Sequence, residues 1–158
     1  MLVVGGDGSF RALNQFYADF GVNFVGVPAT IDNDIAMTDY CLGVDTASNV
    51  IVKAIDSLRD TGTSMRRAFV VEVMGRDCGY LAMVSALACG AEVCIVPEID
   101  YNLDSITQRL KSRLHVERHS VFAIVAEGVK VGDYLTRMFQ DNLGVDSRMT
   151  VLGHIRVR

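Results

Sequence analysis

Short apolar segments alternate along this chain with longer amphipathic ones, and this alternation limits the possible folds more than any other feature. Several apolar segments, such as VCIV at 93–96 and SVFAIVA at 120–126, are continuously apolar and do not alternate with polar residues. Strands of this kind are typical of a parallel sheet that is covered on both faces. The sequence therefore predicts an α/β fold, with a mostly parallel sheet flanked by helices on both faces.

The same alternation predicts the order of the elements. We expect strands at residues 2–4, 23–27, 68–73, 93–96, 120–126 and 148–152, and helices at 9–19, 44–60, 78–89, 104–117 and 132–143. Asn102 or Asp104 is a suitable N-cap for the fourth helix. No repeat or Pro-rich linker interrupts the pattern, so we expect residues 1–158 to form a single α/β unit, incomplete at both ends. The second helix has one broad apolar face, made of Val44, Ala47, Val50, Ile51, Ala54, Ile55 and Leu58.

The composition excludes several classes of function. The formal net charge of −4 argues against a nucleic-acid-binding or acidic-membrane surface. The longest apolar stretch, residues 80–97, contains Gly90 and Glu92, so it is interpreted as a buried helix, a turn and a buried strand rather than a membrane span. The four cysteines form no CxxC pair and no zinc spacing, and we expect buried free thiols. With an N-terminus unlike a signal peptide, these features predict a soluble, cytoplasmic protein.

A Gly-rich segment, GGDGSF at residues 5–10, follows the first strand and leads into the first helix. Ligands of open α/β sheets bind outside the carboxyl ends of strands, and the backbone N–H groups that begin a helix bind phosphate. Asp7 would repel a phosphate unless a cation such as Mg²⁺ lay between them, so the segment is interpreted as a metal–phosphate site or as a tight glycine turn. Neither a Walker A loop nor a GxGxxG fingerprint is present, so those two nucleotide sites are not predicted.

Other polar residues follow the later strands. PATIDND at 28–34 contains Asp32 and Asp34, which form either a simple polar turn or a pair in which one carboxylate takes a proton from a hydroxyl nucleophile. Arg76 follows the strand 68–73, where a guanidinium would neutralise a transferring phosphate, although a lone Arg is more often a solvated side chain. Glu127 and His154 follow the last two strands. Because parallel strands end at the same edge of a sheet, we expect these residues to meet at one cleft.

With GGDGS, PATIDND, EVMGR, AEG at 126–128 and VLGHI in this order, the chain resembles the 6-phosphofructokinases along essentially its whole length. The resemblance implies a Mg²⁺-dependent transfer of the γ-phosphoryl group of ATP to the 1-hydroxyl of fructose 6-phosphate, in a homotetramer. It also implies that this chain is the middle portion of a longer one. Its end, HIRVR, departs from the family pattern GHIQRGG, which puts one sugar-binding arginine in doubt.

The resemblance implies roles for individual residues. Asp7 corresponds to the carboxylate that binds Mg²⁺ and nucleotide, with Gly6, Gly8 and Ser9 beside the ATP phosphates. Asp32 corresponds to the catalytic base on the 1-hydroxyl, while Thr30 and Asp34 orient the phosphoryl group and support the base or metal. The sugar and the migrating phosphate would contact residues Met74, Gly75, Arg76, Glu127 and His154.

Further residues match positions at subunit contacts. Arg67 and Arg148 correspond to arginines that reach the 6-phosphate from a neighbouring subunit, so the resemblance implies shared active sites. An allosteric effector site between subunits would contain Arg59, Gly90, Glu92 and Arg118.

Two alternative functions stay open. Pyrophosphate-dependent relatives carry GGDDS and a Lys before TIDND, whereas this chain has the small residues Gly8 and Ala29, which favours ATP. A non-catalytic phosphate-binding fragment is the other alternative, and the retention of Asp7, Asp32 and Arg76 argues against it.

Overall fold

The computed structural model describes residues 1–62, 67–116 and 120–153. Two parallel sheets lie within this part of the chain. The elements in order are β1 (Leu2–Gly5), α1 (Asp7–Phe20), β2 (Val25–Pro28), α2 (Val44–Gly62), β3 (Arg67–Val73), α3 (Tyr80–Cys89), β4 (Val93–Ile95), α4 (Leu103–Val116), β5 (Val121–Ala126), a short 3-10 helix η1 (Glu127–Val129), α5 (Gly132–Leu143) and β6 (Asp146–Leu152).

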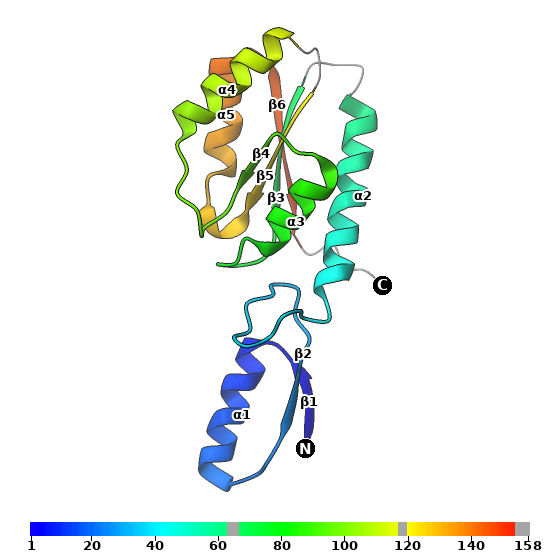
Figure 1. Ribbon diagram of the computed structural model, residues 1–158, viewed down its shortest axis with the longest axis vertical. Helices are drawn as coiled ribbons and strands as arrows, with labels where there is room; N and C mark the ends of the chain where they lie inside the picture. The colour runs from blue at the N-terminus through cyan, green and yellow to red at the C-terminus, as the bar shows by residue number, and fades with distance from the viewer. Residues whose placement is uncertain (63–66, 117–119, 154–158) are drawn as a thin grey trace.

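The larger sheet has the strand order β4-β5-β3-β6, and every pair of neighbours is parallel. Helices α2 and α3 cover one face and α4 and α5 cover the other (Figure 1). The pleat of β3 divides its side chains between the two layers: Phe69, Val71 and Val73 pack towards α2 and α3, while Ala68 and Val70 face α4 and α5. The predicted α/β architecture with helices on both faces is confirmed.

Strands β1 and β2 form a second parallel sheet of their own, which the sequence pattern did not distinguish from the larger sheet. Val3 pairs with Gly26 in parallel, and α1 lies against this pair of strands. No residue of α1 is buried, and large apolar side chains of this N-terminal unit, including Leu2, Phe20 and Val25, are mostly exposed. The unit extends away from the larger sheet, and the carboxyl ends of its two strands point towards the carboxyl ends of β3 and β5 (Figure 1).

The positions of the elements agree closely with the sequence pattern. The apolar stretch 80–97 is a helix, a turn and a strand, as predicted. Asn102 caps α4, because its Oδ1 accepts a hydrogen bond of 2.9 Å from the Ser105 N–H. The third helix begins at Tyr80 rather than at residue 78, because residues 75–78 form a turn that is closed by a bond from the Cys78 N–H to the Gly75 carbonyl. In the described part of the chain no helix is long and apolar enough to cross a membrane.

All four cysteines are free, as expected, but the prediction that they are buried holds only for Cys41. Cys78 and Cys89 are partly buried, and Cys94 is exposed. Cys94 lies on β4, the edge strand of the larger sheet, where no further strand covers it within the described residues.

Candidate active site

The segment after β2 is a turn held by its own side chains. The Asp32 N–H donates to Thr30 Oγ1 over 3.2 Å, and the Cys41 N–H donates to Asn33 Oδ1 over 2.9 Å. Asn33 has a φ of 57°, a left-handed conformation that Asn tolerates better than most residues. The turn therefore buries Asp32, which is only 7% exposed.

Arg76 reaches this turn from the end of β3. Its Nε lies 3.4 Å from Asp32 Oδ2, and its Nη1 lies 4.0 Å from Asp34 Oδ2. Arg76 has a φ of 51° and follows Gly75 at a φ of 139°. A left-handed conformation costs a residue with a Cβ on the order of 1–3 kcal/mol, so the surrounding structure has to stabilise this turn.

Glu127 supplies part of that stabilisation from the end of β5. Its Oε1 accepts hydrogen bonds from the backbone N–H groups of Gly75, over 3.2 Å, and Arg76, over 2.8 Å. Gly128 packs so closely that a Cβ there would overlap the Arg76 carbonyl oxygen. The ends of β3 and β5 of the larger sheet and the end of β2 of the smaller sheet thus meet around Asp32.

The pKa of Asp32 is raised above its ordinary value. Burial of the carboxyl is the main cause, and the negative charges of Asp34 and Glu127 add to it. The positive charge of Arg76 and the hydrogen bond with Thr30 act in the opposite direction without cancelling the rise. The proton affinity of Asp32 is therefore higher than that of a solvated aspartate, which favours a group that accepts a proton from a hydroxyl.

The GGDGS segment lies beside this cluster. Gly6 is the N-cap of α1, and the cap makes no side-chain hydrogen bond, so the first N–H groups of the helix remain available to an anion. A Cβ on Gly6 would lie 3.5 Å from the Thr30 Cβ, which places the two segments in contact. A Cβ on Gly8 would meet no atom within 4 Å, so there is open space next to it. Ser9 is the third residue of α1, and its side chain occupies the space that a Cβ on Gly5 would need.

The donor set suits Mg²⁺ held partly by phosphate. Asp7 lies in the first turn of α1, where its carboxylate forms an ion pair of 3.0 Å with the exposed Arg11. The described residues contain no cluster of three or more potential metal ligands. A single hard carboxylate oxygen is nonetheless consistent with Mg²⁺, which binds through one or two carboxylates together with substrate phosphates.

Arg67 and Arg148 lie together, but at the opposite end of the larger sheet. Both form ion pairs with Asp146, at 2.8 Å and 3.3 Å. Arg67 is the first residue of β3, whereas Arg76 follows its last. Neither arginine therefore belongs to the Asp32 cluster of the same chain.

Three of the proposed effector residues also meet at that opposite end. Arg59 Nη2 donates to the Cys89 carbonyl over 2.5 Å, next to Gly90, and its guanidinium lies 4.9 Å from the centre of the Phe122 ring. Glu92 Oε2 accepts a 2.7 Å hydrogen bond from the Phe122 N–H. Arg118 and His154, which were also predicted as site residues, lie outside the described residues.

Sequence reasoning missed two contributors to the site. Asn33 fixes the turn by bonding the Cys41 N–H, and Lys130, with a φ of 59°, ends η1 behind Glu127. An Asn between two aspartates after a strand was the available signal for Asn33, since Asn is common in left-handed turns.

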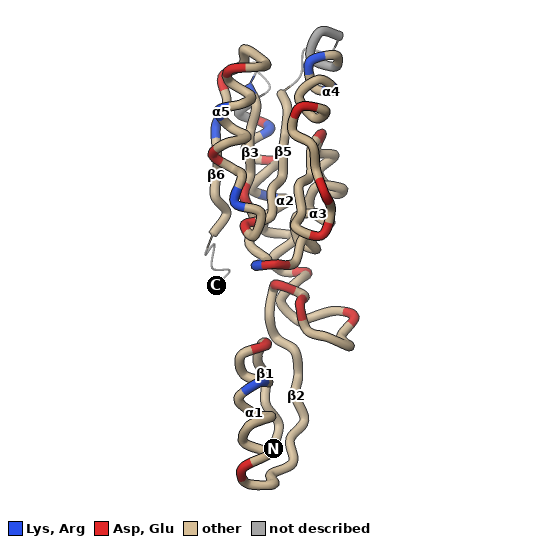
Figure 2. Tube along the Cα trace, turned by 90° about the vertical axis from the view of Figure 1, so that its left-hand side faces the viewer, with Lys and Arg blue, Asp and Glu red and all other residues tan. Residues whose placement is uncertain are grey.

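Acidic positions gather where the N-terminal unit meets the larger sheet (Figure 2).

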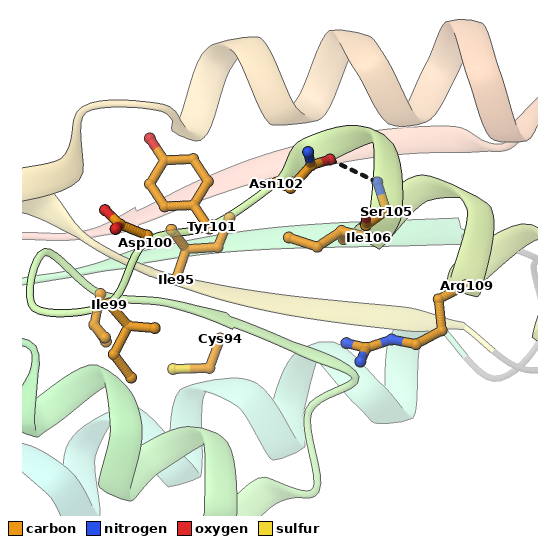
Figure 3. Close-up of a pocket in the computed structure, with 10 residues that line it drawn as sticks. Cys94, Ile95, Ile99, Asp100, Tyr101, Asn102, Ser105, Ile106 and Arg109 are labelled. Carbon is orange, nitrogen blue, oxygen red and sulfur yellow. Dashed lines mark hydrogen bonds between the residues drawn. The ribbon is translucent and has the colours of Figure 1, made fainter.

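A cavity of about 440 Å³ lies elsewhere, along the outer edge of β4 (Figure 3). Ile95 and Cys94 of β4 line one side, and Ile106 and Arg109 of α4 line the other, with Tyr101 between the two elements. None of the residues predicted from the sequence to bind substrate, nucleotide or effector lines this cavity.

Comparison with known proteins gives one consistent family. Residues 1–157 match the family model described as phosphofructokinase. The chain is 53% identical over 157 residues to the ATP-dependent 6-phosphofructokinase of Wolinella succinogenes and 52% identical over 155 residues to that of Sulfurimonas denitrificans. These alignments cover 99% and 98% of this chain but 49% of each relative, so the chain spans about half the length of the curated relatives it matches.

Solved structures give the same result. Phosphofructokinase from Pichia pastoris in the T-state superimposes with a TM-score of 0.88 at 29% identity, covering 98% of this chain and 18% of the other. A pyrophosphate-dependent phosphofructokinase from Nitrosospira multiformis superimposes with a TM-score of 0.76 over 98% of this chain and 44% of the other, and at 23% identity it shares the fold alone.

Proposed function

Because this chain belongs to the phosphofructokinase family, we propose that the protein containing it transfers the γ-phosphoryl group of ATP to the 1-hydroxyl of fructose 6-phosphate. The observation that carries the proposal is the buried Asp32, paired with Arg76 and lying next to the N-terminus of α1. Phosphoryl transfer requires a base, a cationic side chain and an anion-binding helix N-terminus at one place, which Asp32, Arg76 and α1 would supply.

Asp32 is the proposed general base. It takes the proton from the 1-hydroxyl as that oxygen attacks the γ-phosphorus, and the bond from this phosphorus to the bridging oxygen breaks so that ADP leaves. The Arg76 guanidinium neutralises charge on the transferring phosphoryl group. Thr30 and Asp34 orient the reacting groups. The N–H groups of Gly6, Gly8 and Ser9, together with the Asp7 carboxylate, hold the nucleotide, and Mg²⁺ bound there would neutralise phosphate charge. The sugar would contact Met74, Gly75, Glu127 and His154.

The whole protein is proposed to be a cytoplasmic homotetramer with shared active sites. Arg67 and Arg148 lie far from Asp32 in the same chain, which supports their binding the 6-phosphate in the site of a neighbouring subunit. The grouping of Arg59, Gly90 and Glu92 near Phe122 supports a separate effector site, to which Arg118 would contribute.

ATP is the favoured donor. The open space at Gly8 leaves room for a nucleotide, and the relatives of highest identity named above are ATP-dependent enzymes. The test is to express the protein from its natural gene and measure fructose 1,6-bisphosphate formed from fructose 6-phosphate with ATP or with pyrophosphate. Turnover with pyrophosphate alone would support the alternative donor. Binding of both substrates without product would support a non-catalytic phosphate-binding fragment.

A further inference from the structure

We propose that Glu127 is a positioning residue for Arg76: its carboxylate holds the backbone of the Gly75–Arg76 turn and so directs the Arg76 guanidinium towards Asp32. This inference rests on the proposed function and deepens it. It concerns how the Arg76 guanidinium is positioned, rather than which residues contact the sugar.

The hydrogen bonds show which part of Glu127 is engaged. Oε1 accepts from both N–H groups of the turn, at 3.2 Å for Gly75 and 2.8 Å for Arg76. A carboxylate that accepts two backbone N–H bonds forms a charge-assisted contact of fixed direction. Oε2 makes no hydrogen bond within the described part of the chain, so it remains free for a ligand such as a sugar hydroxyl.

Arg76 needs such support because little else fixes it. Its side chain is 65% exposed, and the ion pairs with Asp32 and Asp34, at 3.4 Å and 4.0 Å, are long. Its φ of 51° is a conformation that a residue with a Cβ does not adopt readily. The direction of the guanidinium therefore depends on the backbone, and Glu127 is the side chain bonded to that backbone.

The element that carries Glu127 is itself pressed against the turn. Gly128, the second residue of η1, contacts the Arg76 carbonyl where no side chain would fit. The η1 helix is closed by a 3.2 Å bond from the Lys130 N–H to the Glu127 carbonyl. Two consecutive residues of η1 thus contact the N–H side and the carbonyl side of the same turn.

The substitutions Glu127→Gln and Glu127→Ala separate the possible roles. Gln keeps an oxygen that can accept the hydrogen bonds from the two N–H groups and loses only the negative charge. Ala loses the acceptor oxygen as well as the charge. Positioning predicts that kcat falls about 100-fold in Glu127→Ala, the usual effect of a displaced reacting group, and that Glu127→Gln recovers most of the loss. Equal kcat losses in both variants would overturn the proposal, and so would a rise in KM for fructose 6-phosphate with kcat unchanged.

A double-mutant cycle tests whether Glu127 acts through Arg76. In the presence of Arg76→Ala, Glu127→Ala should reduce kcat little further, because the group it positions is already absent. Asn102→Ala is the matched control, since it also removes a side-chain acceptor from a backbone N–H but at the start of α4. Asn102→Ala should change kcat by the same factor in the presence and in the absence of Arg76→Ala. Full additivity of Glu127→Ala and Arg76→Ala would contradict the proposal.

Hydrogen exchange gives a readout that does not depend on activity. The amides of Gly75 and Arg76 should exchange faster in Glu127→Ala than in the wild type and stay protected in Glu127→Gln. If the wild type shows no turnover, the proposed function fails while the exchange experiment still decides the positioning role. Unchanged protection in Glu127→Ala would overturn that role.

Discussion

At the scale of single residues, the candidate site gathers groups that are costly to hold in a folded chain. Asn33 and Arg76 have positive φ values within the two turns of the cluster, and Lys130, also at a positive φ, ends the η1 helix that begins with Glu127. Asp32 is buried close to two further carboxylates, and its raised pKa measures the cost of keeping it charged. Strain and unfavourable charge are typical of functional sites, where they are retained because catalysis uses them.

The first prediction concerns catalysis by Asp32. Asp32→Asn keeps the shape of the side chain but removes the base, so kcat should fall by about 10²–10⁴, the usual contribution of general-base assistance. KM for fructose 6-phosphate should change little, because arginines and not Asp32 are proposed to bind the phosphate. Steady-state rates at saturating ATP check this. A kcat close to that of the wild type would mean that TIDND is only a structural turn.

The second prediction concerns stability and pH. A carboxyl with a raised pKa destabilises the folded chain when it is charged, so Asp32→Asn should unfold at a higher temperature than the wild type at pH 7. The difference should shrink as the pH falls through the raised pKa and vanish below the ordinary value of 3.8, where both side chains are neutral. Thermal unfolding over this pH range is the measurement. A variant less stable at pH 7 would show that the attraction to Arg76 dominates.

The site residues were predictable only in part, because strand ends can be read from a sequence and long-range bonds cannot. Arg76 and Glu127 each follow an apolar strand of the larger sheet, so their meeting at one edge follows from its parallel order. Asp32 follows β2 of the smaller sheet, and its position beside them depends on how the two sheets face each other (Figure 1). The bond between Glu127 and the Arg76 N–H joins residues 51 positions apart and leaves no local pattern. The roles of these residues in catalysis stay predictions.

At the scale of elements, the site depends on two short pieces of backbone that approach closely. The η1 helix contacts the turn after β3 through Gly128, and the start of α1 contacts the turn after β2 through Gly6. The sequence predicted the helices and long strands well because their apolar periodicity is strong. It did not show that β1 and β2 pair only with each other, because pairing between strands depends on contacts far apart in the chain.

The third prediction concerns the contact between η1 and the turn. Gly128→Ala places a Cβ against the Arg76 carbonyl, so the turn has to move. We expect a loss of stability of about 1–3 kcal/mol, as for other overpacked sites, together with a lower kcat. Gly144→Ala is the control: Gly144 has a φ of 64° at the end of α5 and open space around it, so this variant should lose stability and keep its kcat. Urea unfolding and steady-state rates compare the two.

The fourth prediction concerns the phosphoryl donor. Gly8→Asp with Ala29→Lys fills the open space beside the start of α1 and adds a carboxylate that repels the nucleotide phosphates. The double variant should raise KM for ATP and lower kcat/KM with ATP. Donor titrations with ATP and with pyrophosphate are the measurement, and unchanged kinetics with ATP would remove the structural basis for choosing that donor.

At the scale of the whole molecule, the predicted site residues divide into two groups at opposite ends of the larger sheet. Asp32, Arg76 and Glu127 lie at the carboxyl ends of the strands, while Arg67 and Arg148 lie at the other end, paired with Asp146. One chain cannot bring both groups to one substrate. If both serve the same reaction, the arginines have to act in the site of another subunit.

The last prediction tests whether active sites are shared, by mixing two variants of low activity. Asp32→Asn and Arg67→Ser should each have low activity, the first through kcat and the second through weak binding of fructose 6-phosphate. When subunits of the two variants exchange, a shared site can combine an intact Asp32 from one subunit with an intact Arg67 from the other. Random mixing across a two-fold interface should then restore about one quarter of the wild-type activity. If Arg67 served the site of its own chain, every site in the mixture would lack one of the two residues, and mixing would restore nothing.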